Sequence, residues 1–150
     1  MTNGSALHSL LVPFILSTTL LFGSVIPAQA QISVIACKSA KIDTSKFGKA
    51  ELKEIFTGTK LRWPDGSKIH VVDQLDGEIG EKFYKTVTGK SATQVRKQWT
   101  KLALSGQASA PIKCTSDKAV KKLIAGNPNA VGYISTRSLD DSVREIIRIE

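Results

Sequence analysis

Residues 49–72 constrain the fold most, because they read as a helix, a tight turn and a short strand in direct succession. Apolar residues recur at helical spacing over 49–56, and Gly58 follows at the point where a left-handed residue commonly ends a helix. Residues 63–66, Trp-Pro-Asp-Gly, have the composition of a reverse turn. Residues 69–72 are β-branched and short, as expected of a strand. The sequence therefore predicts one complete helix, turn and strand here.

This segment resembles the text "LSKAELRDIFLGKITNWPDGSPIVPV" of the type II periplasmic solute-binding proteins, particularly the phosphate-binding components of ABC uptake systems. A second match is residues 127–135, Asn-Pro-Asn-Ala-Val-Gly-Tyr-Ile-Ser, which resembles "TPGAIGYVS" of that family. With residues 89–91 and Trp99, the resemblance spans most of residues 31–138. It implies a single lobe of such a binding protein, and it implies binding of a solute rather than catalysis.

Hydrophobic periodicity along the rest of the chain predicts further helices and strands. Ile79, Phe83 and Val87 recur at four-residue spacing, whereas apolar and charged residues alternate over 143–150 and favour a strand. Because strands alternate with helices, we expect an α/β domain, one periplasmic-binding-protein-like lobe with a mixed β-sheet flanked by helices. The expected helices are 77–88, one capped by Ser91 and one capped by Ser116, and the other expected strands are 32–36 and 131–134.

Residues 1–30 have the pattern of a secretory signal peptide, which leaves residues 31–150 as one periplasmic-binding-protein-like domain. The first 30 residues contain no Lys, Arg, Asp or Glu, include an apolar run and finish in Ala28-Gln-Ala30. No basic residue precedes that run, so an uncleaved anchor stays the alternative. We expect an exported, periplasmic protein with no transmembrane span once the signal is removed.

The chain has two cysteines, Cys37 and Cys114. Export would place both in an oxidising compartment, and their number is even, so we expect a disulfide between them. The alternative is two unrelated buried thiols.

Motifs that carry catalysis are missing from the sequence. His70 is the one histidine after residue 30, and two cysteines and one histidine do not suffice for a usual zinc site. We find no Gly-x-Ser-x-Gly elbow, P-loop or dinucleotide fingerprint. The sequence therefore indicates a protein that is not an enzyme and that needs no metal or cofactor.

In the family resembled, a segment like "R-x-D-G-S-G-T-R" holds an oxyanion at a helix N-terminus. Its Ser-Gly-Thr positions fall on Gly77, Glu78 and Ile79 here, and its arginine falls on or near Asp73. Acidic side chains at Asp73, Asp76 and Glu78 would oppose a phosphate, so we expect weak phosphate binding or none. The candidate ligand-binding residues are Gly77, together with Lys38 and Ser39 after the first strand.

The formal net charge is +8, and the stretch 82–116 carries seven basic residues and no acidic one. This stretch is either a solvated surface or a docking patch for an anionic partner. The leading hypothesis is an exported solute-binding-like module that binds a small anion weakly or together with a partner. The alternative is a non-catalytic interaction module of the cell envelope, with a second copy or an envelope protein as its partner. No feature of the sequence indicates nucleic acid.

Overall fold

Five strands form one sheet in the order β3-β2-β4-β1-β5 in the computed structural model, which describes residues 31–75 and 77–150. Strand β2 runs parallel to β3 and β4, whereas β1 runs antiparallel to β4 and β5. The mixed sheet of the predicted α/β class is thus confirmed. The strands are β1 (Ile32–Ala36), β2 (His70–Gln74), β3 (Ile112–Cys114), β4 (Ala130–Ser135) and β5 (Arg144–Ile149).

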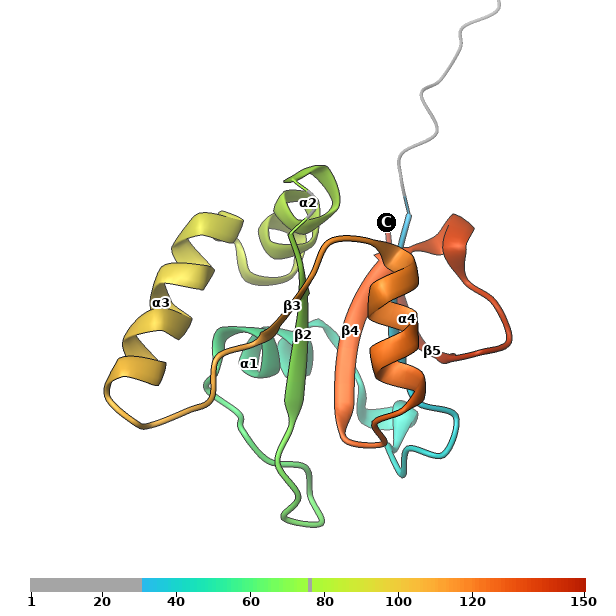
Figure 1. Ribbon diagram of the computed structural model, residues 1–150, viewed down its shortest axis with the longest axis horizontal. Coiled ribbons are helices and arrows are strands. Elements are labelled where there is room, and N and C mark those ends of the chain that lie inside the picture. Colours follow the sequence, from blue (N-terminus) through green and yellow to red (C-terminus); the bar gives the residue numbers. More distant parts are fainter. Residues whose placement is uncertain (1–30, 76) are drawn as a thin grey trace, which may run out of the picture.

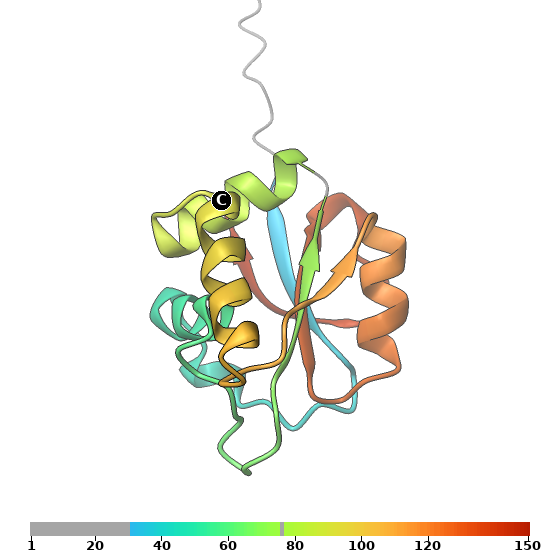
Figure 2. The ribbon, with the colours of Figure 1, turned by 60° about the vertical axis from the view of Figure 1, so that its left-hand side comes forward.

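Helices cover both faces of this sheet (Figures 1 and 2). Three of them, α1 (Lys49–Thr57), α2 (Gly77–Thr88) and α3 (Ala92–Leu104), lie on one side, and α4 (Asp117–Ala125) lies on the other. Two short 3-10 helices, Thr44–Lys46 and Thr136–Ser138, complete the described elements.

The sheet separates the two main clusters of the core, because successive side chains of a strand point to opposite faces. In β4, Val131 and Tyr133 pack with the residues of α1, α2 and α3, whereas Ile134 packs with Val120 and Ile124 of α4. All five side chains are fully buried. The two-residue period therefore gives each face of the sheet its own layer of helices.

The helix ends agree with the sequence. Ser91 and Gln94 form a reciprocal capping box at the start of α3, and Ser116 caps α4 by accepting a hydrogen bond from Ala119 N. Gly58 ends α1 in the left-handed region, at φ 77°. Strand β3 was missed, since three residues after a proline show no alternation that a pattern could detect.

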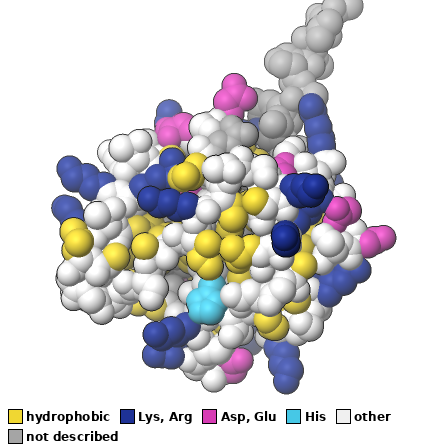
Figure 3. Space-filling model, viewed as in Figure 1, with side chains coloured by type: hydrophobic (Ala, Val, Ile, Leu, Met, Phe, Trp, Pro, Cys, Tyr) yellow, Lys and Arg dark blue, Asp and Glu magenta, His cyan; other side chains and the backbone are white. Residues whose placement is uncertain are grey.

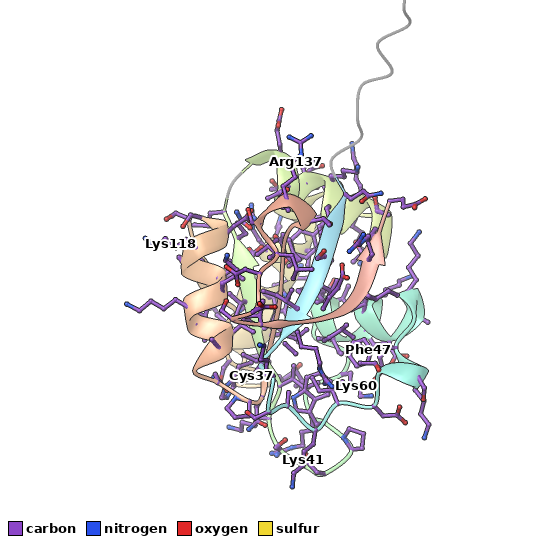
Figure 4. All side chains as sticks on the ribbon, turned by 90° about the vertical axis from the view of Figure 1, so that its right-hand side faces the viewer. Cys37, Lys41, Phe47, Lys60, Lys118 and Arg137 are labelled. Carbon is purple, nitrogen blue, oxygen red and sulfur yellow. The ribbon has the colours of Figure 1, made fainter. Side chains whose placement is uncertain are left out.

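The predicted disulfide is wrong, because Cys37 and Cys114 are separate buried thiols. Cys37 follows the end of β1, which pairs with the beginning of β4, whereas Cys114 pairs with Gln74 at the far end of the parallel strands. Figure 4 shows Cys37 at the end of the sheet opposite to Lys118 and Arg137. Export and an even cysteine count carry no information about distance, which is what bridging requires.

Residues 1–30, the predicted signal peptide, lie outside the described residues. Within 31–75 and 77–150, none of the helices has both the length and the apolar character needed to cross a bilayer.

Candidate functional site

A cleft of about 580 Å³ opens at the carboxyl ends of the three parallel strands. Strand β2 contributes Gln74, β4 contributes Ser135, and the neighbouring start of β1 contributes Ile32. The first two turns of α2 contribute Glu78, Ile79 and Lys82. The start of α4 contributes Asp117 and Lys118, which follow the wall residues Thr115 and Ser116.

The topology explains why a cleft forms at this edge. Strand β2 continues into α2 on one face of the sheet, whereas its neighbour β3 continues into α4 on the other face. Chain segments that diverge in this way leave a crevice at the carboxyl ends of the strands, the usual ligand position in open α/β sheets. Both helices begin at this crevice, so the positive ends of two helix dipoles and their unpaired N–H groups lie beside it.

Charges on the cleft wall are balanced. Lys82 and Lys118 are the cations, and Glu78 and Asp117 are the anions among the described wall residues. Asp117 is already engaged, since its Oδ1 accepts a hydrogen bond from Ser135 N at 3.4 Å. The described wall therefore carries as many cations as anions, whereas Asp76, which the sequence analysis also expected to oppose an anion, lies outside the described residues.

The Gln74 side chain lines the cleft and has one polar atom without a partner among the described residues. Gln74 is 2% exposed, and its side-chain Oε1 forms no hydrogen bond with the described residues. A buried amide oxygen left unpaired is costly, and exchanging the two ends of the amide would present N–H donors instead. Gln74 can thus either accept from a ligand hydroxyl or donate to a ligand oxyanion.

Asp73 does not face the cleft, which corrects the sequence-based interpretation. It is 1% exposed and points toward α3, where Arg96 donates from Nε to Oδ2 at 2.7 Å and from Nη2 to Oδ1 at 3.2 Å. Tyr133 donates its hydroxyl proton to Oδ1 at 2.8 Å. Asp73 therefore does not lie where an anion in the cleft would meet its carboxylate, because the two-residue period of β2 turns it into the core while Gln74 reaches the cleft.

The surroundings of Asp73 also shift the pKa values of Arg96 and Tyr133. The hydrogen bond to Asp73 raises the pKa of the Arg96 guanidinium, and burial raises the pKa of the Tyr133 phenol. Both groups therefore keep their protons, and the charge of Asp73 is compensated from within the core.

Gly80 allows α2 to approach this network closely. A Cβ atom at Gly80 would lie 3.0 Å from Gln74 O, 3.2 Å from Arg96 Nη2 and 3.2 Å from the Tyr133 hydroxyl. Arg96 Nη2 also donates to Gln74 O at 3.0 Å. The first turn of α2 thus packs directly against the network that joins the end of β2 to Arg96 and Tyr133.

The predicted ligand-binding residues are not brought together. Lys38 and Ser39 are exposed in the turn after β1, at the opposite end of the sheet from the cleft, and Ser39 Oγ lies 3.2 Å from Cys37 Sγ. Gly77 begins α2, directly before the wall residue Glu78. A ligand role in the cleft therefore remains a prediction for Gly77, whereas Lys38 and Ser39 lie too far from it to join.

Sequence reasoning missed the contribution of residues 115–118 and of Ser135. The signal for Ser116 was present, since it was predicted as a helix cap. Its place in the cleft depends on β3, which brings the start of α4 beside β2. For metals, the described residues contain no group of three His, Cys, Asp or Glu side chains that could hold an ion.

A mixed sheet with helices on both faces and a cleft between two helix N-termini is the architecture of a binding-protein lobe. The phosphate-binding protein PstS of Bacillus subtilis (strain 168) is 30% identical over 115 residues, which cover 75% of this chain and 34% of that protein. The chain therefore spans about a third of the length of this curated relative. No family model matches the chain.

Solved structures of phosphate-type binding proteins are also similar to this chain. A Clostridium perfringens protein described as a phosphate ABC transporter substrate-binding protein, solved with bound phosphate, superposes with a TM-score of 0.59 at 25% identity. The match covers 77% of this chain and 44% of that one. An ABC-type phosphate transport receptor from Vibrio cholerae shares the fold, with a TM-score of 0.51 at 20% identity over 77% and 46% of the two chains.

The chain is thus a single-lobe relative of the phosphate-type substrate-binding proteins, as the sequence resemblance implied. These relatives are named as binding proteins and transport receptors, not as enzymes.

Proposed function

We propose that this chain is a non-catalytic solute-binding lobe of the cell envelope that takes a small anion in the cleft between α2 and α4. The buried Gln74 side chain in the cleft wall, whose Oε1 has no hydrogen-bond partner among the described residues, is the observation that carries this proposal. A buried amide oxygen without a partner needs an explanation, and a ligand in the adjoining cleft supplies one.

Two further features support an anion as that ligand. The starts of α2 and α4 both lie at the cleft, where N–H groups and dipoles favour negative charge. The related Clostridium perfringens structure contains phosphate. Glu78 and Asp117 on the wall oppose this charge, so we expect weaker binding than two helix ends alone would give.

A partner that covers the cleft is the second candidate, in which the same lobe acts as an interaction module. Leu75 is 39% exposed directly after the wall residue Gln74, and the chain spans 44% of the related phosphate-bound structure. A second copy or an envelope protein would supply the other wall, and closure around a ligand is what makes such sites tight. Sedimentation of the protein with and without phosphate tests whether a second copy joins.

Calorimetric titration with phosphate and sulfate tests the anion site directly. Gln74→Met removes the amide at similar side-chain volume, and Gln107→Met makes the same change in an exposed loop outside the cleft. We expect measurable anion binding in the wild type, a loss of about tenfold or more in Gln74→Met and no change in Gln107→Met. Equal behaviour of the three proteins would exclude this cleft as the anion site.

A further inference from the structure

A second hollow lies at the other end of the sheet, away from the cleft. We call it the basal groove. It has a volume of about 790 Å³ and runs between residues 61–71 on one side and residues 106–112 on the other, with Asn127 at its end. His70 begins β2 here, whereas the cleft adjoins Gln74 at the end of the same strand.

The floor and the rim of the basal groove differ in chemistry. Buried or half-buried apolar side chains form the floor, namely Leu61, Ile69 and Trp99. Arg62, Lys68 and His70 are exposed along the groove, and none of its lining residues is acidic. Figure 3 shows this combination: hydrophobic side chains (yellow) lie at the centre of the face, and Lys or Arg side chains (dark blue) lie close to the histidine (cyan). An apolar floor bordered by the two cations Arg62 and Lys68 fits an occupant that is itself apolar and acidic.

His70 is oriented to present a hydrogen-bond donor. Asn127 Oδ1 accepts from Asn129 N at 3.1 Å, which fixes the orientation of that amide. Asn127 Nδ2 then donates to His70 Nδ1 at 2.8 Å, so the neutral imidazole carries its proton on Nε2. This exposed N–H is available to a carboxylate.

The wall formed by residues 106–112 is suited to an extended chain. Ser109 and Ala110 take part in no backbone–backbone hydrogen bond with the described residues, and β3, which follows, is an edge strand that pairs with β2 alone. Ile112, the last residue of this segment, is 40% exposed, and Leu104, shortly before the segment, is 84% exposed. Unpaired backbone beside exposed apolar side chains is the template to which extended peptides add.

We propose that the basal groove binds an extended, acidic polypeptide segment of a partner protein, whose carboxylates meet Arg62, Lys68 and His70 and whose apolar side chains contact the floor. This site is separate from the anion cleft and does not depend on it. The occupant is a peptide rather than a lipid surface because the cations line a concave groove that a flat bilayer cannot enter.

Fluorescence anisotropy with a labelled peptide that alternates glutamate and isoleucine tests the proposal. We expect binding at low salt that weakens as salt rises, and no binding of peptides that alternate lysine with isoleucine or glutamate with serine. Excess phosphate should leave the Glu/Ile peptide bound. Amide shifts in a nitrogen-15 NMR titration should appear over residues 69–71 and 106–110, with residues 115–118 unchanged.

Charge reversal supplies the decisive comparison. Arg62→Glu/Lys68→Glu changes the groove, and Lys49→Glu/Lys53→Glu makes the same change of net charge on exposed positions of α1. We expect the first pair to weaken peptide binding at least tenfold and the second pair less than about twofold. Equal losses in both pairs, no binding of the Glu/Ile peptide, or shifts confined to the cleft would overturn the proposal. Binding to anionic phosphatidylglycerol vesicles without peptide binding would also overturn it.

Discussion

Arg96 of α3 forms a bidentate ion pair with Asp73 of β2, with hydrogen bonds from Nε to Oδ2 at 2.7 Å and from Nη2 to Oδ1 at 3.2 Å. Asp73 is nearly inaccessible, whereas the Arg96 side chain is 31% exposed. Tyr133 adds a third donor to the same carboxylate. The pair therefore joins a strand, a helix and the neighbouring strand beneath the cleft, and removing one member leaves charge buried without compensation.

We predict that Asp73→Ala lowers the free energy of unfolding by about 3–5 kcal/mol, because it strands the partly buried guanidinium and the Tyr133 hydroxyl. Urea denaturation measures this change. Asp141→Ala, at an exposed position without a hydrogen bond or ion pair in the described residues, is the matched control and should be near neutral. A loss below about 1 kcal/mol in Asp73→Ala would show that the network contributes little.

Gly80→Ala should destabilise the protein by about 1–3 kcal/mol, since the new methyl group would lie 3.0 Å from a backbone oxygen that cannot move easily. Gly77→Ala, three residues earlier in α2, meets no atom within 4 Å and serves as control. Thermal unfolding of the two variants distinguishes close packing from the general effect of alanine in a helix. Equal stability of the two would argue against the close approach.

The elements were predictable where a local signal existed. Ser91 and Ser116 cap helices because their side chains reach nearby N–H groups, and Gly58 takes a positive φ that other residues avoid. The site was predictable only in part, because it depends on partners distant in sequence. The residues near Asp73 in the sequence do not indicate that Arg96 and Tyr133 will compensate its charge. Because β3 was not predicted, the start of α4 could not be placed at the cleft.

The two cysteines should remain free thiols. Thiol-specific labelling of the native protein should be slow at both Cys37 and Cys114, because both are buried and burial also raises the pKa of the Cys114 thiol. In denaturant without reductant, both should label fully. The midpoint of urea unfolding should be the same with and without reductant. Failure of both cysteines to label in denaturant would show that they are joined in a disulfide.

Glu145 gives a defined pH dependence. Arg148 donates to both of its carboxylate oxygens at 3.0 Å, and these hydrogen bonds lower the pKa of Glu145 despite the opposing effect of burial. A lowered folded-state pKa means stabilisation that is present above the unfolded value, about 4.3, and is lost as pH falls through the folded value. Glu145→Gln should therefore lower the melting temperature at pH 7 and approach the wild type at pH 3. The exposed Glu150→Gln should show no such convergence, and a constant gap in Glu145→Gln would contradict the linkage.

Glu78 is the acidic residue on the α2 side of the cleft, and it should limit anion affinity. A carboxylate about 4 Å from a bound anion opposes it by roughly 4 kcal/mol at an effective dielectric of 20, and less at longer range. Glu78→Gln removes this charge, and Glu54→Gln makes the same change at an exposed position on α1, away from the cleft. Calorimetric titration with phosphate should show at least a tenfold gain for Glu78→Gln at low salt, shrinking as salt screens the charge, and no gain for Glu54→Gln. Equal affinities for the two variants would mean that the anion does not approach the start of α2.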